Sequence, residues 1–434
     1  MQQEQQRALE TISQDQLDAL VDLHNRFLDG RIGGRRANLE NTDLTGLSLK
    51  NKDLRQANFS GCRMVYMNLS EANFQEASLY ACDLSNSNLY HTIFIRSDLR
   101  GARIENANLE GADLESADLR VGGLAQGADF AGGGAKAVNF KGANLSGARL
   151  AGSMASNADF SDAMLSGANM AKADLRGASL EGANLSNADI DGAQLKGANI
   201  KSAILTGVEL GDLKKVGMDL SEAITDDNIG RAVSDLDSPL PKLLDDHREW
   251  LKSRGKVGQQ LDLSSVDLRL LGTLKMEKLT AIKAVKAKFF GMNLYKIELQ
   301  SAVLTGSDFR NCDMEDADLR GSCFHDVNFS HANLKGADCS ALMLGAGGTS
   351  RFNPCDFENA RFRYANLQGV VFKDANFKGA DLSYADFTGA DLRGADFTGA
   401  IMDNTVLDET MTDGAKFDRD KSRPVFRIPT EASE

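Results

Sequence analysis

Few residues in this chain have the types and spacing that chemistry requires. The six Cys residues include no Cys-x-x-Cys pair, and the five His residues are scattered along the sequence, so no zinc-ligand spacing is present. No nucleophile elbow, P-loop or dinucleotide fingerprint occurs. We therefore expect no catalytic residue, no cofactor and no metal, and we predict that the protein is not an enzyme.

Residues 121–137 form a glycine-rich segment that could contact a ligand or a partner. The segment lacks the Lys-Ser/Thr ending and the following helix of a phosphate-binding loop, so we disfavour phosphate binding. A bulge or protruding loop for partner binding is the favoured interpretation. Its candidate contact residues are Gly122, Gly123, Gly132, Gly133, Gly134 and Lys136.

A second group of candidates is basic and lies near residue 280. We expect these residues to form the one concentrated basic surface, which could bind an acidic partner, although a solvated face is the favoured interpretation. The lysines are Lys275, Lys278, Lys283, Lys286 and Lys288. Arg351 follows a second glycine-rich insertion, residues 345–350, and is a further candidate partner contact.

Two histidines occupy equivalent places in two amphipathic segments. His24 and Phe27 lie on the apolar face of one predicted helix, and His247 and Trp250 repeat their spacing at an offset of 223. Each helix is followed by a glycine-containing turn. Proton transfer is one possible role for these histidines, but a matched histidine on the packing face of a helix favours a structural role, and we interpret both helices as N-terminal caps.

The caps precede a strict period of five. A large apolar residue recurs at every fifth position, preceded by Asp or Asn and, two positions back, by Ala or another small residue, as in 377–397. A period of five is neither helical nor that of a plain strand. On an extended backbone the small and large residues point to the same side, so each unit is expected to be one side of a coil closed by a polar or glycine corner.

The register of the repeat changes at two places. It moves by one residue within 121–137 and by three residues within 345–351. The original phase is expected to end at Leu124. The new phases include Phe130 and, as a weak member, Ala135 after the first break, and Phe352 after the second. The weak segment 272–291 keeps the phase of the repeats that follow it, so we prefer continued coil to a helix there.

Composition favours a soluble cytoplasmic protein. The chain has 62 acidic and 49 basic residues, a formal charge of −13, which argues against a dedicated nucleic-acid binder. No apolar run is long enough to cross a membrane, so neither direct nucleic-acid binding nor membrane insertion is expected. Most cysteines occupy inward positions of the repeat, and we favour buried free thiols over a disulfide between Cys62 and Cys82.

The repeats and helices together predict two tandem units. Residues 1–36 are assigned to the first cap, 37–220 to the first coil domain, 221–240 to a short helix and linker, 241–260 to the second cap, 261–420 to the second coil domain and 421–434 to a C-terminal tail. The sequence does not indicate the oligomeric state.

The repeats resemble those of the pentapeptide-repeat family, whose pattern A-[D/N]-[L/F]-x-x stands in Ala168-Asn-Met, Ala173-Asp-Leu, Ala183-Asn-Leu and Ala395-Asp-Phe. The resemblance covers residues 37–210 and 261–418. It implies a β-solenoid, namely a right-handed quadrilateral β-helix with four pentapeptides in each coil. Residues twenty apart would then stack, so Phe357, Phe377, Phe397 and Phe417 are expected to form a ladder.

Two functional hypotheses follow. The first is a non-enzymatic scaffold or adaptor that presents long solenoid faces and loops to a protein partner. The alternative, implied by the resemblance, is a mimic of B-form DNA that modulates DNA gyrase or another DNA-binding protein. The chain has the acidity for mimicry, but Lys and Arg are interspersed along the outward positions, so we favour the scaffold.

Overall fold

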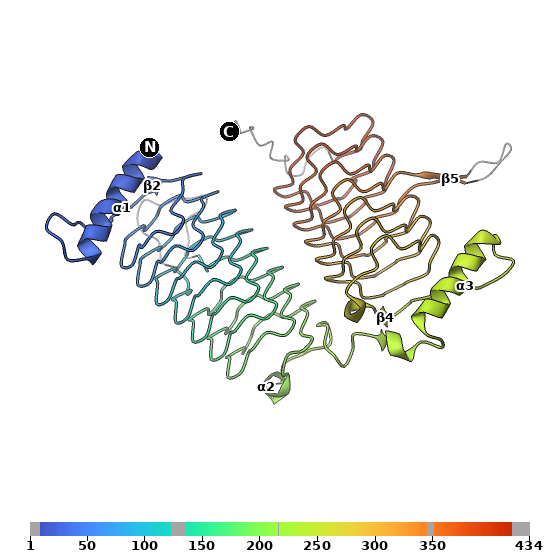
Figure 1. Cartoon of the computed structure of the whole chain (residues 1–434), viewed down its shortest axis with the longest axis horizontal. Helices are drawn as coiled ribbons and strands as arrows, with labels where there is room; N and C mark the ends of the chain where they lie inside the picture. Colours follow the sequence, from blue (N-terminus) through green and yellow to red (C-terminus); the bar gives the residue numbers. More distant parts are fainter. Residues whose placement is uncertain (1–8, 123–135, 216, 345–350, 419–434) are drawn as a thin grey trace, which may run out of the picture. The chain divides into compact units, whose positions relative to one another are not determined.

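The structure is a computed structural model that describes residues 9–122, 136–215, 217–344 and 351–418. The chain divides into two compact units, Met1–Asn228 and Ile229–Glu434. In each unit the backbone winds into a stack of coils (Figure 1). Each coil takes twenty residues, because the outward residue of one side pairs in parallel with the residue twenty positions later over most of the chain.

One pentapeptide, residues 158–162, illustrates why the repeat has its composition. Ala158 and Phe160 are fully buried inside the coil. Asp159 points outward, and its Oδ1 accepts a hydrogen bond from the backbone N–H of Ser161 at 3.0 Å, which fixes the start of the corner. Asp162 then adopts a positive φ of 57°, a conformation that favours Gly and Asn. The N–H of Ala163 donates to the carbonyl of Phe160 at 3.0 Å and closes the corner.

Neighbouring coils are joined by backbone hydrogen bonds on every regular side. The N–H of Phe160 donates to the carbonyl of Ser179 at 2.7 Å, and the N–H of Ser179 donates to the carbonyl of Ala158 at 2.9 Å. Over most of the chain, each side therefore meets the next coil through a parallel bridge whose partners are twenty residues apart.

The interior is a column of stacked side chains. The ring of Phe377 stacks on Phe357 and on Phe397 at 5.0 and 4.9 Å, and Phe397 stacks on Phe417 at 4.9 Å, which confirms the predicted ladder. These separations match the spacing of adjacent strands. Each unit has its own buried apolar cluster, so each has an independent core.

The described part of each unit begins with a two-residue strand, which precedes a helix. In the first unit, β1 (Glu10–Thr11) pairs in parallel with β2 (Thr42–Asp43) on the first coil. Helix α1 (Gln14–Leu28) starts at a capping box formed by Ser13 and Gln16. It contributes the buried side chains of Leu17 and Val21 to the core of the unit.

The second unit repeats this arrangement. Strand β3 (Arg231–Ala232) pairs in parallel with β4 (Val266–Asp267), and helix α3 (Leu240–Lys252) lies between them in the sequence. A 3₁₀ turn, η1 (Val233–Asp235), precedes α3, and a second one, η2 (Arg269–Leu271), follows β4. Thus η1 is the helical turn found in the predicted linker 221–240.

The end of the first coil stack differs from the prediction. A short helix, α2 (Gly211–Lys215), interrupts the repeat, and Ile224 still pairs with Ile204 at the usual offset of twenty. The coil therefore extends beyond residue 220. The weak segment 272–291 forms regular coil, with Thr273, Lys278 and Lys283 each bridged to residues twenty positions later.

The two register breaks are insertions into an otherwise continuous coil. Across the first break, Arg103 pairs with Asn139, an offset of 36. Across the second, Cys323 pairs with Asp356, an offset of 33. Compared with the regular offset of twenty, the insertions therefore add sixteen and thirteen residues. The sequence showed phase shifts of only one and three residues, because multiples of five leave the phase unchanged. Leu124, Phe130 and Ala135 lie outside the described residues.

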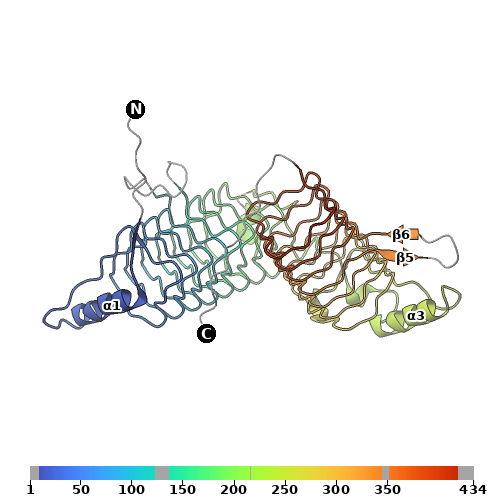
Figure 2. The same ribbon diagram turned by 90° about the horizontal axis from the view of Figure 1, so that it is seen from above.

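The second insertion carries an antiparallel hairpin of β5 (Leu342–Leu344) and β6 (Arg351–Asn353) that projects from the coils (Figure 2). The assignment of Phe352 to an inward position was wrong. Phe352 lies in β6 and is 52% exposed, because the hairpin leaves the coil before residue 342 and returns after residue 353. Among the described residues, no helix is both long and apolar enough to span a bilayer.

Candidate functional site

The outward carboxylates of the coils are engaged in the corners. In many repeats an Arg two residues after the Asp turns back to it, so that Asp174 accepts hydrogen bonds from Arg176 at 2.8 and 2.7 Å. This guanidinium holds the pKa of the Asp174 carboxyl below its ordinary value. The same two-residue pairing occurs at Asp53, Asp98, Asp118, Asp318 and Asp391. These side chains stabilise turns and do not converge as acid and base.

One such pair is buried. Asp308 and Arg310 are each 4% exposed, and Arg310 Nη2 lies 2.6 Å from Asp308 Oδ2. Burial alone would raise the pKa of Asp308, but the charge and hydrogen bonds of Arg310 lower it overall. This pair is therefore a structural ion pair inside the second unit.

The lysines predicted to form one basic surface surround the coil instead. Residues five apart lie on successive sides, so Lys278, Lys283 and Lys288 occupy three different sides. Lys275 belongs to the fourth, and Lys286 stands at a corner with a positive φ of 58°. These lysines are close in sequence, but each step of five residues moves the chain to the next side of the coil and so separates their side chains. The prediction of a single basic surface was therefore wrong.

Ion pairs further reduce the positive charge that these lysines present. Lys278 Nζ lies 2.9 Å from Glu298 Oε1, and Lys283 Nζ lies 3.1 Å from Asp262 Oδ2. Lys288 is half-buried, and burial lowers the pKa of its ammonium group. A partner that needs one dense cationic face would not find it here.

The base of the first insertion is a close backbone pair. The N–H of Gly122 donates to the carbonyl of Lys136 at 2.9 Å, and the reverse bond measures 3.2 Å. A Cβ at Gly122 would lie 2.9 Å from the Cα of Gly101, so glycine is required for this approach. Lys136 is exposed. Gly123, Gly132, Gly133 and Gly134 lie outside the described residues.

The hairpin presents two exposed apolar side chains. Met343 of β5 faces Phe352 of β6 in the antiparallel register, and their exposed fractions are 62% and 52%. Asn353 Nδ2 donates to the carbonyl of Gly321 at 2.6 Å and attaches the hairpin to the preceding coil. Arg351 is the first residue of β6, opposite Leu344.

The paired histidines make the same backbone contacts in both units. His24 is buried; its Nδ1 accepts from the N–H of Ala37 at 3.1 Å, and its Nε2 donates to the carbonyl of Arg55 at 3.1 Å. His247 accepts from the N–H of Leu261 at 3.2 Å and donates to the carbonyl of Thr280 at 3.1 Å.

The aromatic neighbours of these histidines are also equivalent. Phe27 stacks on His24 at 5.9 Å, and Trp250 stacks on His247 at 5.7 Å. Burial lowers the pKa of both imidazoles. Because each ring bridges two backbone groups, neither nitrogen is free for proton transfer.

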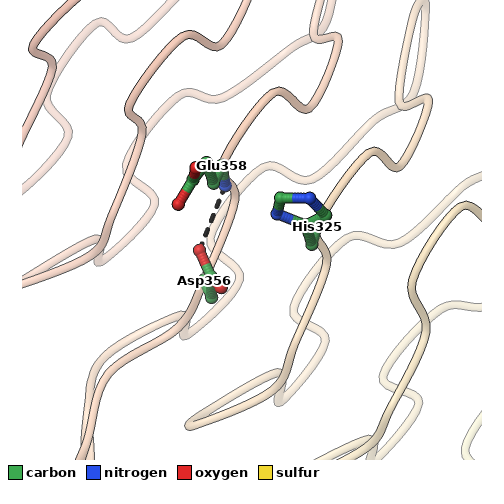
Figure 3. Close-up of side chains that lie close together, drawn as sticks. All are labelled: His325, Asp356 and Glu358. Carbon is green, nitrogen blue, oxygen red and sulfur yellow. Dashed lines mark hydrogen bonds between the residues drawn. The ribbon is translucent and has the colours of Figure 1, made fainter.

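A group missed from the sequence lies beside the hairpin. His325, Asp356 and Glu358 place one potential ligand atom each within 4.8 Å of the others, and all three are half-buried. Figure 3 shows the imidazole facing the two carboxyl groups and the hydrogen bond from the Glu358 N–H to Asp356 Oδ1, which measures 3.1 Å. The second insertion separates His325 from Asp356 in sequence, so spacing gave no sign of it.

A cavity of about 920 Å³ lies within the first unit, between its last full coil and α2. Ile190 and Leu195 contribute apolar lining, and Arg176, Asp189 and Lys196 contribute charge. Of these, Arg176 is already engaged by Asp174. The cavity contains none of the residues predicted to bind a partner.

A protein-family model described as pentapeptide repeats (8 copies) matches the chain in overlapping segments that cover residues 37–120, 136–207, 286–341 and 355–419. These segments make up more than half of the chain. The chain belongs to the pentapeptide-repeat family. Proteins of this family form right-handed quadrilateral β-helices, in agreement with the four-sided coils of both units. The family model omits the two insertions, as expected if they are additions to the common coil.

Several solved structures are similar to this pentapeptide-repeat protein. HetL, a pentapeptide repeat protein involved in heterocyst differentiation regulation from the cyanobacterium Nostoc sp. Strain PCC 7120, is 18% identical over 90% of this chain and 93% of HetL, with a TM-score of 0.18. Full-length QnrB1, a plasmid-mediated fluoroquinolone resistance protein, is 23% identical over 50% of this chain and 89% of QnrB1, with a TM-score of 0.18. Rfr23 from the cyanobacterium Cyanothece 51142 is 21% identical over 35% and 91%, with a TM-score of 0.16. A comparison with curated proteins found no match.

Proposed function

We propose that this pentapeptide-repeat protein is a non-enzymatic scaffold or adaptor that binds another protein, with the β5–β6 hairpin as its main contact. The exposure of the facing pair Met343 and Phe352 carries the proposal. Met and aromatic side chains are enriched in the cores of protein interfaces, and a flexible Met beside a rigid ring fits a partner's apolar pocket.

The fold does not need this pair. The coil passes the insertion without losing a side, since Cys323 pairs directly with Asp356 and the stack of Phe324 on Phe357 is maintained at 5.0 Å. The inward positions of the coil bury their large apolar side chains, whereas the hairpin exposes two that face each other on paired strands. Retaining exposed apolar residues on an added element is explained by a partner that covers them.

The chemistry of the coil faces supports a binding role over a catalytic one. The outward Asp and Asn residues accept corner hydrogen bonds, and many also hold an Arg. The caps support the same view: we propose that α1 and α3 cover the first coil of each unit, because the histidine of each helix binds two backbone groups of that coil region. The Gly122–Lys136 base marks the first insertion as a second proposed contact.

The test is a pair of matched variants in the full-length protein. Met343→Ser combined with Phe352→Ser removes the apolar pair, and Met276→Ser removes an equally exposed Met, 64% exposed, from a coil corner. In quantitative affinity capture from native cytosol, a stoichiometric partner should be retained by the wild type and Met276→Ser and depleted at least tenfold by the double variant. Equal recovery by all three proteins would reject the hairpin as the contact.

Gyrase supercoiling with a quinolone present distinguishes the alternative of a DNA mimic. The scaffold hypothesis predicts no effect of micromolar protein. A DNA mimic needs continuous acidic faces, whereas here Arg55, Arg176 and Arg393 neutralise carboxylates of their own sides. A dose-dependent change in supercoiling would replace the scaffold proposal with the mimic.

A further inference from the structure

We propose that His325, Asp356 and Glu358 form a binding site for a divalent transition-metal ion, with zinc as the expected occupant. The site goes beyond the proposed scaffold function, since it does not require a protein partner. It consists of one imidazole and two carboxylates on two neighbouring coils, which the parallel bridge between Cys323 and Asp356 joins (Figure 3). The β5–β6 insertion rejoins the stack just before Asp356.

The coil backbone places these groups with little freedom. His325 follows the inward residue Phe324, and Asp356 and Glu358 flank the inward residue Phe357. The two rings stack at 5.0 Å with an interplanar angle of 3°, and the N–H of Phe324 donates to the carbonyl of Asp356 at 2.7 Å. A rigid core therefore holds the three outward side chains on one side, which is the kind of support that a preorganised site requires.

The donor set and distances suit zinc. Imidazole nitrogen and carboxylate oxygen are usual zinc ligands at about 2.0–2.2 Å, and three protein ligands plus water complete a common tetrahedral site. Ligand atoms in such a site are roughly 3.4 Å apart, by the geometry of those bond lengths. The three atoms here lie within 4.8 Å of one another, so rotations of half-exposed side chains suffice to close the site. Calcium and magnesium prefer oxygen ligands alone.

In the first unit, one instance of the same acidic pattern is neutralised by an arginine. Asp113 and Glu115 also flank one inward residue, and Arg149 from the next coil contacts them at 3.0 and 2.5 Å. At the proposed site the equivalent residue is Asn376, whose neutral amide donates to Asp356 at 2.8 Å and to Glu358 at 3.4 Å. Among the side chains that the structure describes, which do not include that of Arg351, no Lys or Arg forms an ion pair with either carboxylate. Two uncompensated charges therefore face an imidazole, an arrangement that a divalent cation would balance.

A neighbouring carboxylate orients the imidazole. Asp326 Oδ2 lies 3.2 Å from Nε2 of His325. A proton on Nε2 would be shared with this carboxylate, which leaves Nδ1 with the lone pair needed for a metal. Carboxylate–histidine contacts of this kind commonly support metal ligands. A bound ion would link the coil before the insertion to the coil after it.

Equilibrium dialysis of the full-length, untagged protein against zinc tests the site, with cobalt absorption as a second readout of tetrahedral ligands. We expect one zinc ion per chain and at least tenfold weaker binding for both His325→Ala and Glu358→Gln. The matched controls are His331→Ala, a histidine that stacks on Tyr364 at 5.0 Å, and Glu315→Gln, which has the same acidic pattern beside Asp313 without a histidine. Both controls should keep the wild-type affinity.

Cys323 provides a further control, because its thiol lies 3.5 Å from Thr305 Oγ1 and outside the three-ligand cluster. Cys323→Ser should change zinc affinity less than threefold, and a loss equal to that of His325→Ala would overturn the three-ligand assignment. The proposal is also overturned if zinc binding is not saturable, if His325→Ala binds like the wild type while retaining its circular dichroism spectrum, or if calcium binds more tightly than zinc.

Discussion

Replacing His247 by Ala should destabilise the start of the second unit by a predictable amount. The imidazole is fully buried and bridges two backbone groups, the N–H of Leu261 and the carbonyl of Thr280. A buried polar group that loses its partner costs about 1–3 kcal/mol. The substitution should therefore lower the free energy of unfolding by about 2–6 kcal/mol, with both groups left unpaired.

The same contacts predict a pH dependence with a definite sign. Nδ1 accepts a hydrogen bond, so the folded protein needs the neutral ring, and burial lowers the pKa of His247 below its ordinary 6.5. As the pH falls below 6.5, the unfolded chain binds a proton that the folded chain does not. Stability should decrease by about 1.4 kcal/mol per pH unit until the folded-state pKa is reached. His247→Ala should lack this contribution.

Trp250 supplies the assay. It is the only Trp in the sequence and stacks on His247 at 5.7 Å, so its fluorescence during urea unfolding reports the second unit. Transitions would be compared at pH 7.5 and 5.5 for the wild type, His247→Ala and the matched variant His24→Ala. The control should leave the Trp250 transition unchanged. A His247→Ala midpoint equal to that of the wild type, or a wild-type midpoint that rises on acidification, would refute the reasoning.

Three further outcomes follow from buried contacts. Gly321→Ala should displace the hairpin, because Gly321 has a φ of +64° and an added Cβ would lie 3.0 Å from Leu342; increased proteolysis at the hairpin checks this result. Arg310→Leu should cost about 3–5 kcal/mol in urea unfolding, because Asp308 would remain buried without its partner, whereas replacing both residues by apolar ones should recover much of that loss. Burial raises the pKa of Cys62 to about 12, so native protein at pH 8 should leave this thiol unmodified by iodoacetamide, and mass spectrometry should detect labelling only after unfolding.

The coil could be predicted from the sequence because its local and global patterns coincide. The Ala158-Asp-Phe unit specifies an inward pair and a corner within five residues, and the stack of Phe357 on Phe377 follows from four units per coil. The matched contacts of His24 and His247 were likewise indicated by their constant offset. These features could be predicted because each depends on residues that are close together in the sequence or that repeat at a constant offset.

The sites were harder to predict because the coil reorders neighbours. Lysines five residues apart lie on different sides, so the expected basic surface was wrong. His325 and Asp356 lie on neighbouring coils, but the insertion separates them in the sequence. A shift in the five-residue phase does not give the full length of an insertion, because every complete group of five inserted residues leaves the phase unchanged. Aligning Cys323-Phe-His directly with Asp356-Phe-Glu would have revealed the cluster. Phe352 matched the period by chance within a hairpin that the pattern could not distinguish from coil.

The continuity of the coil across its insertions has a consequence for protein engineering. After the first insertion, Asn139 pairs with Asp159 at the ordinary offset of twenty, as if the intervening segment were absent. The backbone pairs Gly122–Lys136 and Leu342–Asn353 thus mark two places at which the chain can be lengthened without changing the geometry of the stack. Foreign peptides of unrelated length could be grafted there, and their two ends would be held at a fixed separation by the backbone pairs already present. The protein could therefore display foreign peptides at two defined positions.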